Sequence, residues 1–197
     1  MTDHFFVPLP LLADMGIPMI VVTLPAMVML LVPVIVIEGL LCKRWLGLTT
    51  LQAIKSNAVS NLASTIIGVP VAWAIMLAVE FGTLGVIGLV DKSNAIQNWQ
   101  SPLATVISFL LTSPWLYPTD RKWVIPAATL VLLIPFYFAS YWIEYFIVRR
   151  MVAMPDGEPP NLAYPRVRIA VRNANLITYG AMFLATSVWL GVSLPRH

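Results

Sequence analysis

The stretch VIVIEGLLCKRWLG (residues 34–47) sets Glu38 inside an apolar run and closes that run with a basic pair. A second stretch, YWIEYFIVRRMVA (residues 141–153), repeats this order around Glu144. In both stretches an arginine follows the glutamate by six residues. A charged group at the centre of a membrane helix costs about 2.5–3.5 kcal/mol on insertion scales, so it usually faces the interior of a bundle. The two stretches therefore predict two membrane helices, each with an inward-facing carboxyl group near one end.

The composition of the whole chain indicates a membrane protein. Hydrophobic residues make up 59% of the 197 residues and charged residues only 11%, whereas ordinary soluble domains have about 25% charged residues. Several apolar runs reach the ~20 residues that a helix needs to cross a hydrocarbon core. These runs are continuous and do not alternate apolar with polar residues, which argues against a barrel. The predicted fold class is an all-α integral membrane protein with a single transmembrane domain, residues 1–197.

Four transmembrane helices are predicted, arranged as two helical hairpins. We place the spans at about residues 17–42, 57–79, 123–148 and 169–194. A loop at 151–165, which contains prolines and acidic residues, joins the last two spans. A further apolar run is shorter than the ~17–25 residues of a span. We predict that it forms a short interfacial or re-entrant helix at about 102–117.

The positions of lysine and arginine decide between four spans and five. With four spans, eight of the twelve Lys and Arg residues collect at the hairpin loops, and with five spans they divide six to six. The eight are Lys43, Arg44, Lys55, Arg149, Arg150, Arg166, Arg168 and Arg172. Because cytoplasmic loops are rich in Lys and Arg, four spans are favoured, with both termini outside. The expected location is a bacterial inner membrane, with anionic lipid headgroups bound at the basic cytoplasmic ends.

The two hairpins suggest a parallel pseudo-repeat of residues 17–79 and 123–194. After its glutamate, each copy passes through a loop into an apolar run that carries an Asn-Ala pair, Asn57-Ala58 or Asn173-Ala174. A tryptophan follows each of these asparagines by sixteen residues. Few other positions match, so duplication and chance recurrence are both compatible with the pattern.

The two glutamates require polar partners inside the bundle. Amide and basic side chains lie at comparable depth on the helices that follow, and we predict that they form one polar cluster with the glutamates. Its expected members are Glu38, Glu144, Asn57, Asn61, Arg172, Asn173 and Asn175. Such a cluster either fixes the register of the helices or binds a proton, an ion or a headgroup.

Small residues recur at every fourth position of the second predicted span. They are Ser56, Ser60, Ser64 and Gly68. Small side chains at this spacing let helix backbones approach closely. We predict a helix-packing ridge here, with a polar pathway as the alternative.

Metal, cofactor and nucleic-acid sites are not expected. The two histidines lie at opposite ends of the chain and Cys42 is the single cysteine, which leaves no ligand set for a metal. No stretch has the motifs of a nucleic-acid module. The first predicted function is interaction, as an accessory or assembly subunit among other membrane subunits or copies of itself. The alternative is a small oligomeric ion, proton or solute transporter or channel that uses the polar cluster. An intramembrane enzyme ranks last, because no nucleophile motif is present.

Overall fold

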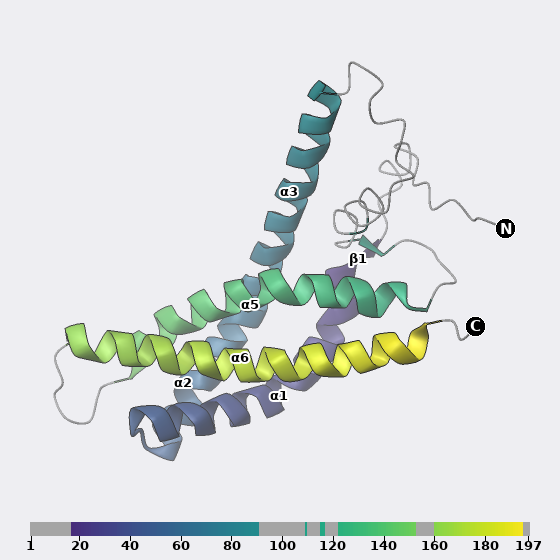
Figure 1. Ribbon diagram of the computed structural model, residues 1–197. Coiled ribbons are helices and arrows are strands. Elements are labelled where there is room, and N and C mark those ends of the chain that lie inside the picture. Colours follow the sequence, from purple (N-terminus) through teal and green to yellow (C-terminus); the bar gives the residue numbers. More distant parts are fainter. Residues whose placement is uncertain (1–16, 91–108, 110–114, 117–121, 153–159, 195–197) are drawn as a thin grey trace.

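The structure of the protein is a computed structural model, which describes residues 17–90, 109, 115–116, 122–152 and 160–194. Nearly all of this part is helical (Figure 1). The helices are α1 (Met19–Leu46), α2 (Thr50–Ala63), η2 (Ser64–Gly68), α3 (Val69–Val90), α5 (Val124–Met151) and α6 (Pro160–Ser193). Two short strands, β1 (Ile17–Pro18) and β2 (Trp115–Leu116), pair antiparallel. β1 directly precedes α1, and β2 lies between α3 and α5 in the chain.

Four helical segments are long and apolar enough to cross a membrane. They are Pro25–Leu46, Thr50–Thr83, Val124–Met151 and Tyr164–Ser193. The second segment is continuous in the chain and consists of α2, η2 and most of α3. The prediction of a helical protein with four such helices is confirmed.

Some predicted boundaries are wrong. The helix expected to end at 79 continues as α3 to Val90. α6 begins at Pro160, inside the expected loop 151–165, and this is possible because the first residue of a helix does not need its N–H for a helical hydrogen bond. Most of the segment 102–117 lies outside the described residues; of the residues described within it, Phe109 is helical and Trp115–Leu116 is extended, so the predicted short helix is not confirmed.

The helices pack as a bundle in which neighbours in sequence are neighbours in space. α1 and α5 run in the same direction, and α2 and α6 return beside them (Figure 1). α1 packs on α2 and α6, and α5 packs on the same two helices. α3 leaves the bundle at a steep angle (Figure 1). The carboxyl-terminal ends of α1 and α5 therefore lie at the same end of the bundle.

The connection between α1 and α2 is a tight turn. Gly47 has a φ of 68°, a conformation that glycine adopts without steric cost. Thr49 then caps α2: its hydroxyl accepts a hydrogen bond from the backbone N–H of Gln52, and the Gln52 side chain accepts one from the backbone N–H of Thr49. This capping box fixes the residue at which the second helix begins.

Two apolar clusters form the core of the bundle, with a polar layer between them. On α5, the buried residues recur at every fourth position, as Leu132, Phe136, Ser140, Glu144 and Val148. The first two belong to one apolar cluster and Val148 belongs to the other. The Ser140 and Glu144 side chains thus lie between the two apolar clusters, away from both ends of the bundle.

A wide-turned π-helical segment, η2, interrupts the long second helix just before Pro70. Proline has no N–H to donate to the carbonyl four residues earlier, which here belongs to Ile66, so the α-helical hydrogen-bond pattern cannot continue. Such segments often occur at functional sites. In this chain the first residue of η2 is Ser64, which belongs to the polar layer.

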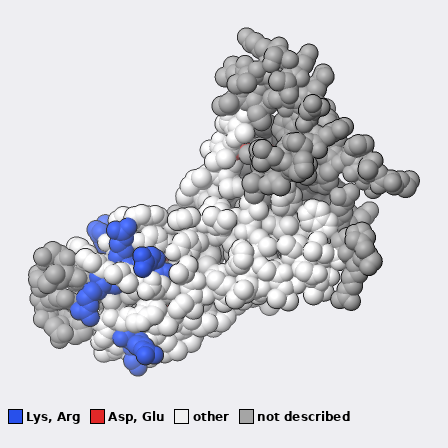
Figure 2. All heavy atoms as spheres, in the orientation of Figure 1, with Lys and Arg blue, Asp and Glu red and all other residues white. Residues whose placement is uncertain are grey.

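Basic side chains gather at one end of the bundle (Figure 2). The last turns of α1 and α5 supply Lys43, Arg44, Arg149 and Arg150. The Arg149 guanidinium lies over the rings of Phe146 and Tyr164, at 5.1 Å from each ring centre. This end of the bundle therefore carries positive charge next to aromatic rings.

Candidate functional site

Glu38 of α1 is fully buried and accepts hydrogen bonds from two other helices. Its Oε2 accepts from Asn61 Nδ2 of α2 at 2.7 Å. Its Oε1 accepts from the Thr178 hydroxyl of α6 at 2.6 Å. Each carboxyl oxygen of Glu38 therefore has one donor from a different helix.

Glu144 of α5 is equally buried and accepts three hydrogen bonds. Its Oε2 accepts from Asn175 Nδ2 of α6 at 2.6 Å. Its Oε1 accepts from the Ser64 hydroxyl of η2 at 3.0 Å and from the Ser140 hydroxyl, one turn earlier on α5, at 2.9 Å. Three helical segments thus converge on this carboxyl group.

Glu38 and Glu144, which we call the carboxyl pair, also face each other. Their exposed fractions are 0% and 1%, and on each returning helix two side chains three residues apart bind one glutamate each, so the two carboxyl groups lie next to one another. Within the described residues, the side chains that donate to the pair are all amides or hydroxyls. Two carboxyl groups can hydrogen-bond to each other only when one of them carries a proton.

Four of the five donors to the carboxyl pair come from a short motif that occurs twice. The sequence Asn61-Leu-Ala-Ser64 on α2 and η2 corresponds to Asn175-Leu-Ile-Thr178 on α6, 114 residues later. In each half the asparagine binds the glutamate of its own half, and the hydroxyl binds the glutamate of the other half. The arrangement is that of an approximate two-fold axis between the two carboxyl groups.

Burial on the returning helices follows the same spacing of 114 residues. Between Thr50 and Ser64 the buried residues are Ala53, Ser56, Asn57, Ser60, Asn61 and Ser64. On α6 the buried residues are Val167, Ala170, Val171, Ala174, Asn175 and Thr178. Each member of the first set precedes a member of the second by 114 residues. The structural equivalent of Asn61 is therefore Asn175, and the sequence alignment of Asn57 with Asn173 is wrong by two residues.

The remaining predicted cluster residues, Asn57, Arg172 and Asn173, form their hydrogen bonds with groups other than the two carboxyl groups. Asn57 is buried next to the pair, where its Nδ2 donates to the Ala53 carbonyl at 2.8 Å and its Oδ1 accepts from the Cys42 thiol at 3.8 Å. The Arg172 side chain is exposed and donates to Asn173 Oδ1 at 3.3 Å. Neither Arg172 nor Asn173 has its side chain on the buried face of α6.

The predicted packing ridge lies inside the bundle. Ser56, Ser60, Ser64 and Gly68 are all buried. A Cβ atom at Gly68 would lie 3.2 Å from Ile143 Cδ1 of α5. The ridge thus packs against another helix of the same chain, and Ser64 also donates to Glu144.

Three polar residues of the site were not predicted from the sequence: Ser140, Thr178 and Tyr179. Hydroxyl residues are common in membrane helices, where they usually bond to the carbonyl one turn earlier. The signal that identifies Thr178 is the repeated Asn-Leu-x-Ser/Thr spacing. Ser140 precedes Glu144 by one turn, the spacing at which helical side chains meet.

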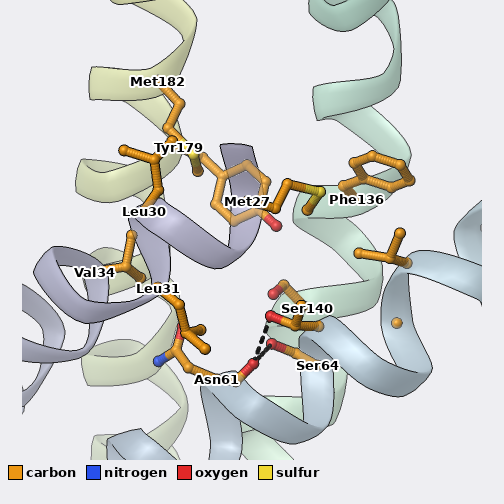
Figure 3. Close-up of a pocket in the computed structure, with 13 residues that line it drawn as sticks. Met27, Leu30, Leu31, Val34, Asn61, Ser64, Phe136, Ser140, Tyr179 and Met182 are labelled. Carbon is orange, nitrogen blue, oxygen red and sulfur yellow. Dashed lines mark hydrogen bonds between the residues drawn. The ribbon is translucent and has the colours of Figure 1, made fainter. Parts of the chain in front are cut away.

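A cavity of about 40 Å³ adjoins the carboxyl pair on the side away from the basic end. Asn61, Ser64 and Ser140 line one part of it, and Met27 and Phe136 line the opposite part (Figure 3). A buried water needs about 10–15 Å³ of such volume and a few polar partners. The cavity therefore has room for water next to the donors that hold Glu144.

The site does not have the donor set of a metal centre. Within the described residues, no group of three or more His, Cys, Asp or Glu side chains is placed to hold a metal ion. Every oxygen of the carboxyl pair already accepts an N–H or O–H. Such donors turn their positive ends toward the site, which opposes a metal cation.

The fold and the site together define a class: a helical bundle with four helices that are suited to a membrane and with two hydrogen-bonded carboxyl groups at its centre. Comparisons with protein-family models, with curated proteins and with solved structures found no match to this chain.

Proposed function

We propose that this chain is a small integral membrane protein that conducts or transports protons, with the carboxyl pair as its proton-holding site. The observation that carries the proposal is the shared burial of Glu38 and Glu144, which are held by neighbouring donors of the same helices, none of them Lys or Arg among the described residues. Ionisable groups inside membrane proteins commonly mark ion or proton pathways. The adjoining cavity provides space for water on one side of the pair.

Electrostatics support a single shared proton. Two unit charges about 4 Å apart repel by about 4 kcal/mol at an effective dielectric constant of 20. Paired carboxyl groups relieve this repulsion by keeping one proton between them. The five surrounding donors stabilise the one remaining negative charge. In this proposal the pair holds one proton at rest and exchanges it during transport.

The proposal includes an orientation in the membrane. We place the turn between α1 and α2 and the basic end of α5 in the cytoplasm of a bacterium, both termini outside, and the chain in the inner membrane as two parallel hairpins. The support is the basic end of the bundle, where Lys and Arg side chains gather (Figure 2). Cytoplasmic ends of membrane helices are enriched in these residues. The same side chains are suited to anionic lipid headgroups.

A second candidate function is that of an accessory or assembly subunit, in which the carboxyl pair only fixes the positions of the helices. The observation in its favour is that all four oxygens of the pair have a donor, as in a structural hydrogen-bond network. The small-residue ridge, which suggested contact with a partner protein, packs on α5 of the same chain. The ridge is therefore not available to a partner.

Reconstitution in liposomes distinguishes the two functions. The purified protein is incorporated into vesicles that contain a pH-sensitive dye, a potassium gradient with valinomycin sets the voltage, and proton uptake is followed. We expect uptake with the natural chain and loss of uptake with Glu38→Gln and Glu144→Gln. Glu80→Gln is the matched control, because Glu80 is also buried but lies on α3, outside the pair. Vesicles that take up no more protons with the natural chain than without it would favour the accessory role.

A further inference from the structure

The two halves of the site are alike at the carboxyl pair but differ directly beside it. Ser140 lies one turn before Glu144, and the residue one turn before Glu38 is Val34. Tyr179 follows Thr178, and the residue that follows Ser64 is Thr65. All four of these side chains line the cavity. Only the Glu144 half of the site therefore has a serine and a tyrosine at these positions.

On this half, polar groups connect the cavity with the carboxyl pair. The Ser140 hydroxyl donates to Glu144 Oε1 at 2.9 Å. The Tyr179 hydroxyl lies across the cavity from Ser140, and both side chains line it (Figure 3). Tyr179, Ser140 and Glu144 thus form a row of oxygen atoms that starts at the cavity and ends at the pair.

The other half of the site has no such row. Val34 has no polar atom, and the Thr65 hydroxyl is directed to its own helix, where it donates to the Asn61 carbonyl at 2.8 Å. Glu38 receives its two donors from Asn61 and Thr178 and has no hydroxyl one turn before it. The two carboxyl groups therefore have unequal access to the cavity.

We infer that Ser140 and Tyr179 are the relay through which protons pass between the cavity and Glu144, and that Glu144 is the member of the pair that exchanges its proton. This inference rests on the proposed function of the carboxyl pair. The hydroxyl groups act as positioning and relay residues, and Glu38 accepts the proton from Glu144 inside the pair.

The proton balance of the relay is simple. A hydronium ion in the cavity gives a proton to the Tyr179 oxygen, the original Tyr179 proton passes to the Ser140 oxygen, and the original Ser140 proton passes to Glu144 Oε1. The hydronium becomes water, and Glu144 changes from carboxylate to carboxylic acid. Rotation of the two hydroxyl groups restores the starting arrangement, because a hydroxyl can both donate and accept.

The other ionisable groups near the relay come from three helices. Tyr137 of α5 packs edge-on against Tyr179, with ring centres 5.6 Å apart. Cys42 of α1 directs its thiol to Asn57, away from the cavity lining. Arg172 of α6 is exposed and bonds to Asn173. None of these three side chains lines the cavity, and among the described residues that do, Tyr179 is the ionisable one.

Hydrogen–deuterium exchange of the buried carboxylic acid tests the relay directly. The infrared C=O band of the pair is recorded in reconstituted protein, and its shift is followed after transfer to D₂O. We expect Ser140→Ala and Tyr179→Phe to slow the exchange about tenfold or more, since each removes a proton-transfer group. Ser140→Thr keeps a hydroxyl and should restore exchange near the natural rate. Val34→Ala and Thr65→Val are the matched controls on the other half and should leave the rate within about twofold.

Liposome uptake by the same variants separates this inference from the proposed function. We expect uptake to fall with Ser140→Ala and Tyr179→Phe and to persist with the two control variants. If Ser140→Ala and Tyr179→Phe exchange and conduct like the natural chain while Glu144→Gln does not conduct, the relay is wrong and the proton function stands. If Glu144→Gln conducts normally, the proposed function itself is wrong.

Discussion

The hydroxyls of Ser64 and Thr178 each donate a hydrogen bond to the glutamate of the other half of the chain. Ser64, from the first half of the chain, donates to Glu144 of the second half, and Thr178 donates to Glu38 of the first half. The asparagine three residues before each hydroxyl binds the glutamate of its own half. The two halves of the chain are therefore joined through the carboxyl pair, and the loss of either hydroxyl should affect both halves.

Loss of the crossed hydroxyls should destabilise the bundle. Thr178→Val removes the donor to Glu38 and nearly keeps the side-chain volume, so a buried carboxyl oxygen loses its partner. We expect the free energy of unfolding to fall by about 1–2 kcal/mol, measured by denaturant titration in micelles. Thr65→Val is the control, because the Thr65 hydroxyl donates only to a backbone carbonyl. Equal stability of the two variants would contradict the crossed arrangement.

The two glutamates should be energetically coupled. Because the two carboxyl groups belong to one buried hydrogen-bond network, the effects of Glu38→Gln and Glu144→Gln on the free energy of unfolding should not add. We expect a coupling energy of about 0.5–3 kcal/mol from a double-mutant cycle. The cycle of Glu80→Gln with Glu144→Gln serves as the reference and should give additive effects. A coupling near zero for the pair would show that the two groups do not interact.

A larger side chain at Gly68 should separate α5 from η2. A Cβ atom there would already lie 3.2 Å from Ile143 Cδ1, so Gly68→Val forces the helices apart and should cost about 1–3 kcal/mol of unfolding free energy. Gly180→Val is the control, because no atom lies within 4 Å of a Cβ at Gly180. Adding Ile143→Ala to Gly68→Val should recover part of the loss. A Gly68→Val variant as stable as the natural chain would mean that this contact is not close.

Chemical labelling of single-cysteine variants can determine the orientation of the protein in the membrane. In a Cys42→Ser background, Leu51→Cys at the start of α2 and Met151→Cys at the end of α5 place exposed thiols at the basic end. We expect both to react with a membrane-impermeant maleimide in inverted vesicles and to be protected in intact cells. Labelling of the two positions from opposite sides would contradict the parallel placement of α1 and α5.

The sequence predicted the membrane class and the glutamates, but not the geometry of the site. The apolar runs and the spacing of Glu38 and Glu144 from their arginines are local patterns, and the four apolar helices are confirmed. The equivalence of Asn61 and Asn175 depends on which face of each helix is buried. A matching Asn-Ala pair and tryptophan favoured another alignment, and only packing shows that Asn173 lies off the buried face.

The position of Arg172 is a second feature that the sequence does not predict. Because it is a cation at a depth comparable to that of the glutamates, the sequence predicts it as their partner. In the structure it lies on the exposed face of α6, three residues before Asn175, which binds Glu144. The widened segment η2 is a further feature that sequence patterns did not reveal, although Pro70 lies two residues after its last residue, Gly68. Hydroxyl and amide donors replaced the expected salt bridge.

The most direct test of the central claim is the infrared spectrum of the reconstituted protein with ¹³C-labelled glutamate. A proton shared by Glu38 and Glu144 predicts a protonated-carboxyl C=O band near neutral pH that shifts with the label. This band should persist in Glu80→Gln and disappear in the Glu38→Gln/Glu144→Gln double variant. A band that is unchanged in the double variant, or absent from the natural chain, would contradict the claim that the carboxyl pair holds a proton.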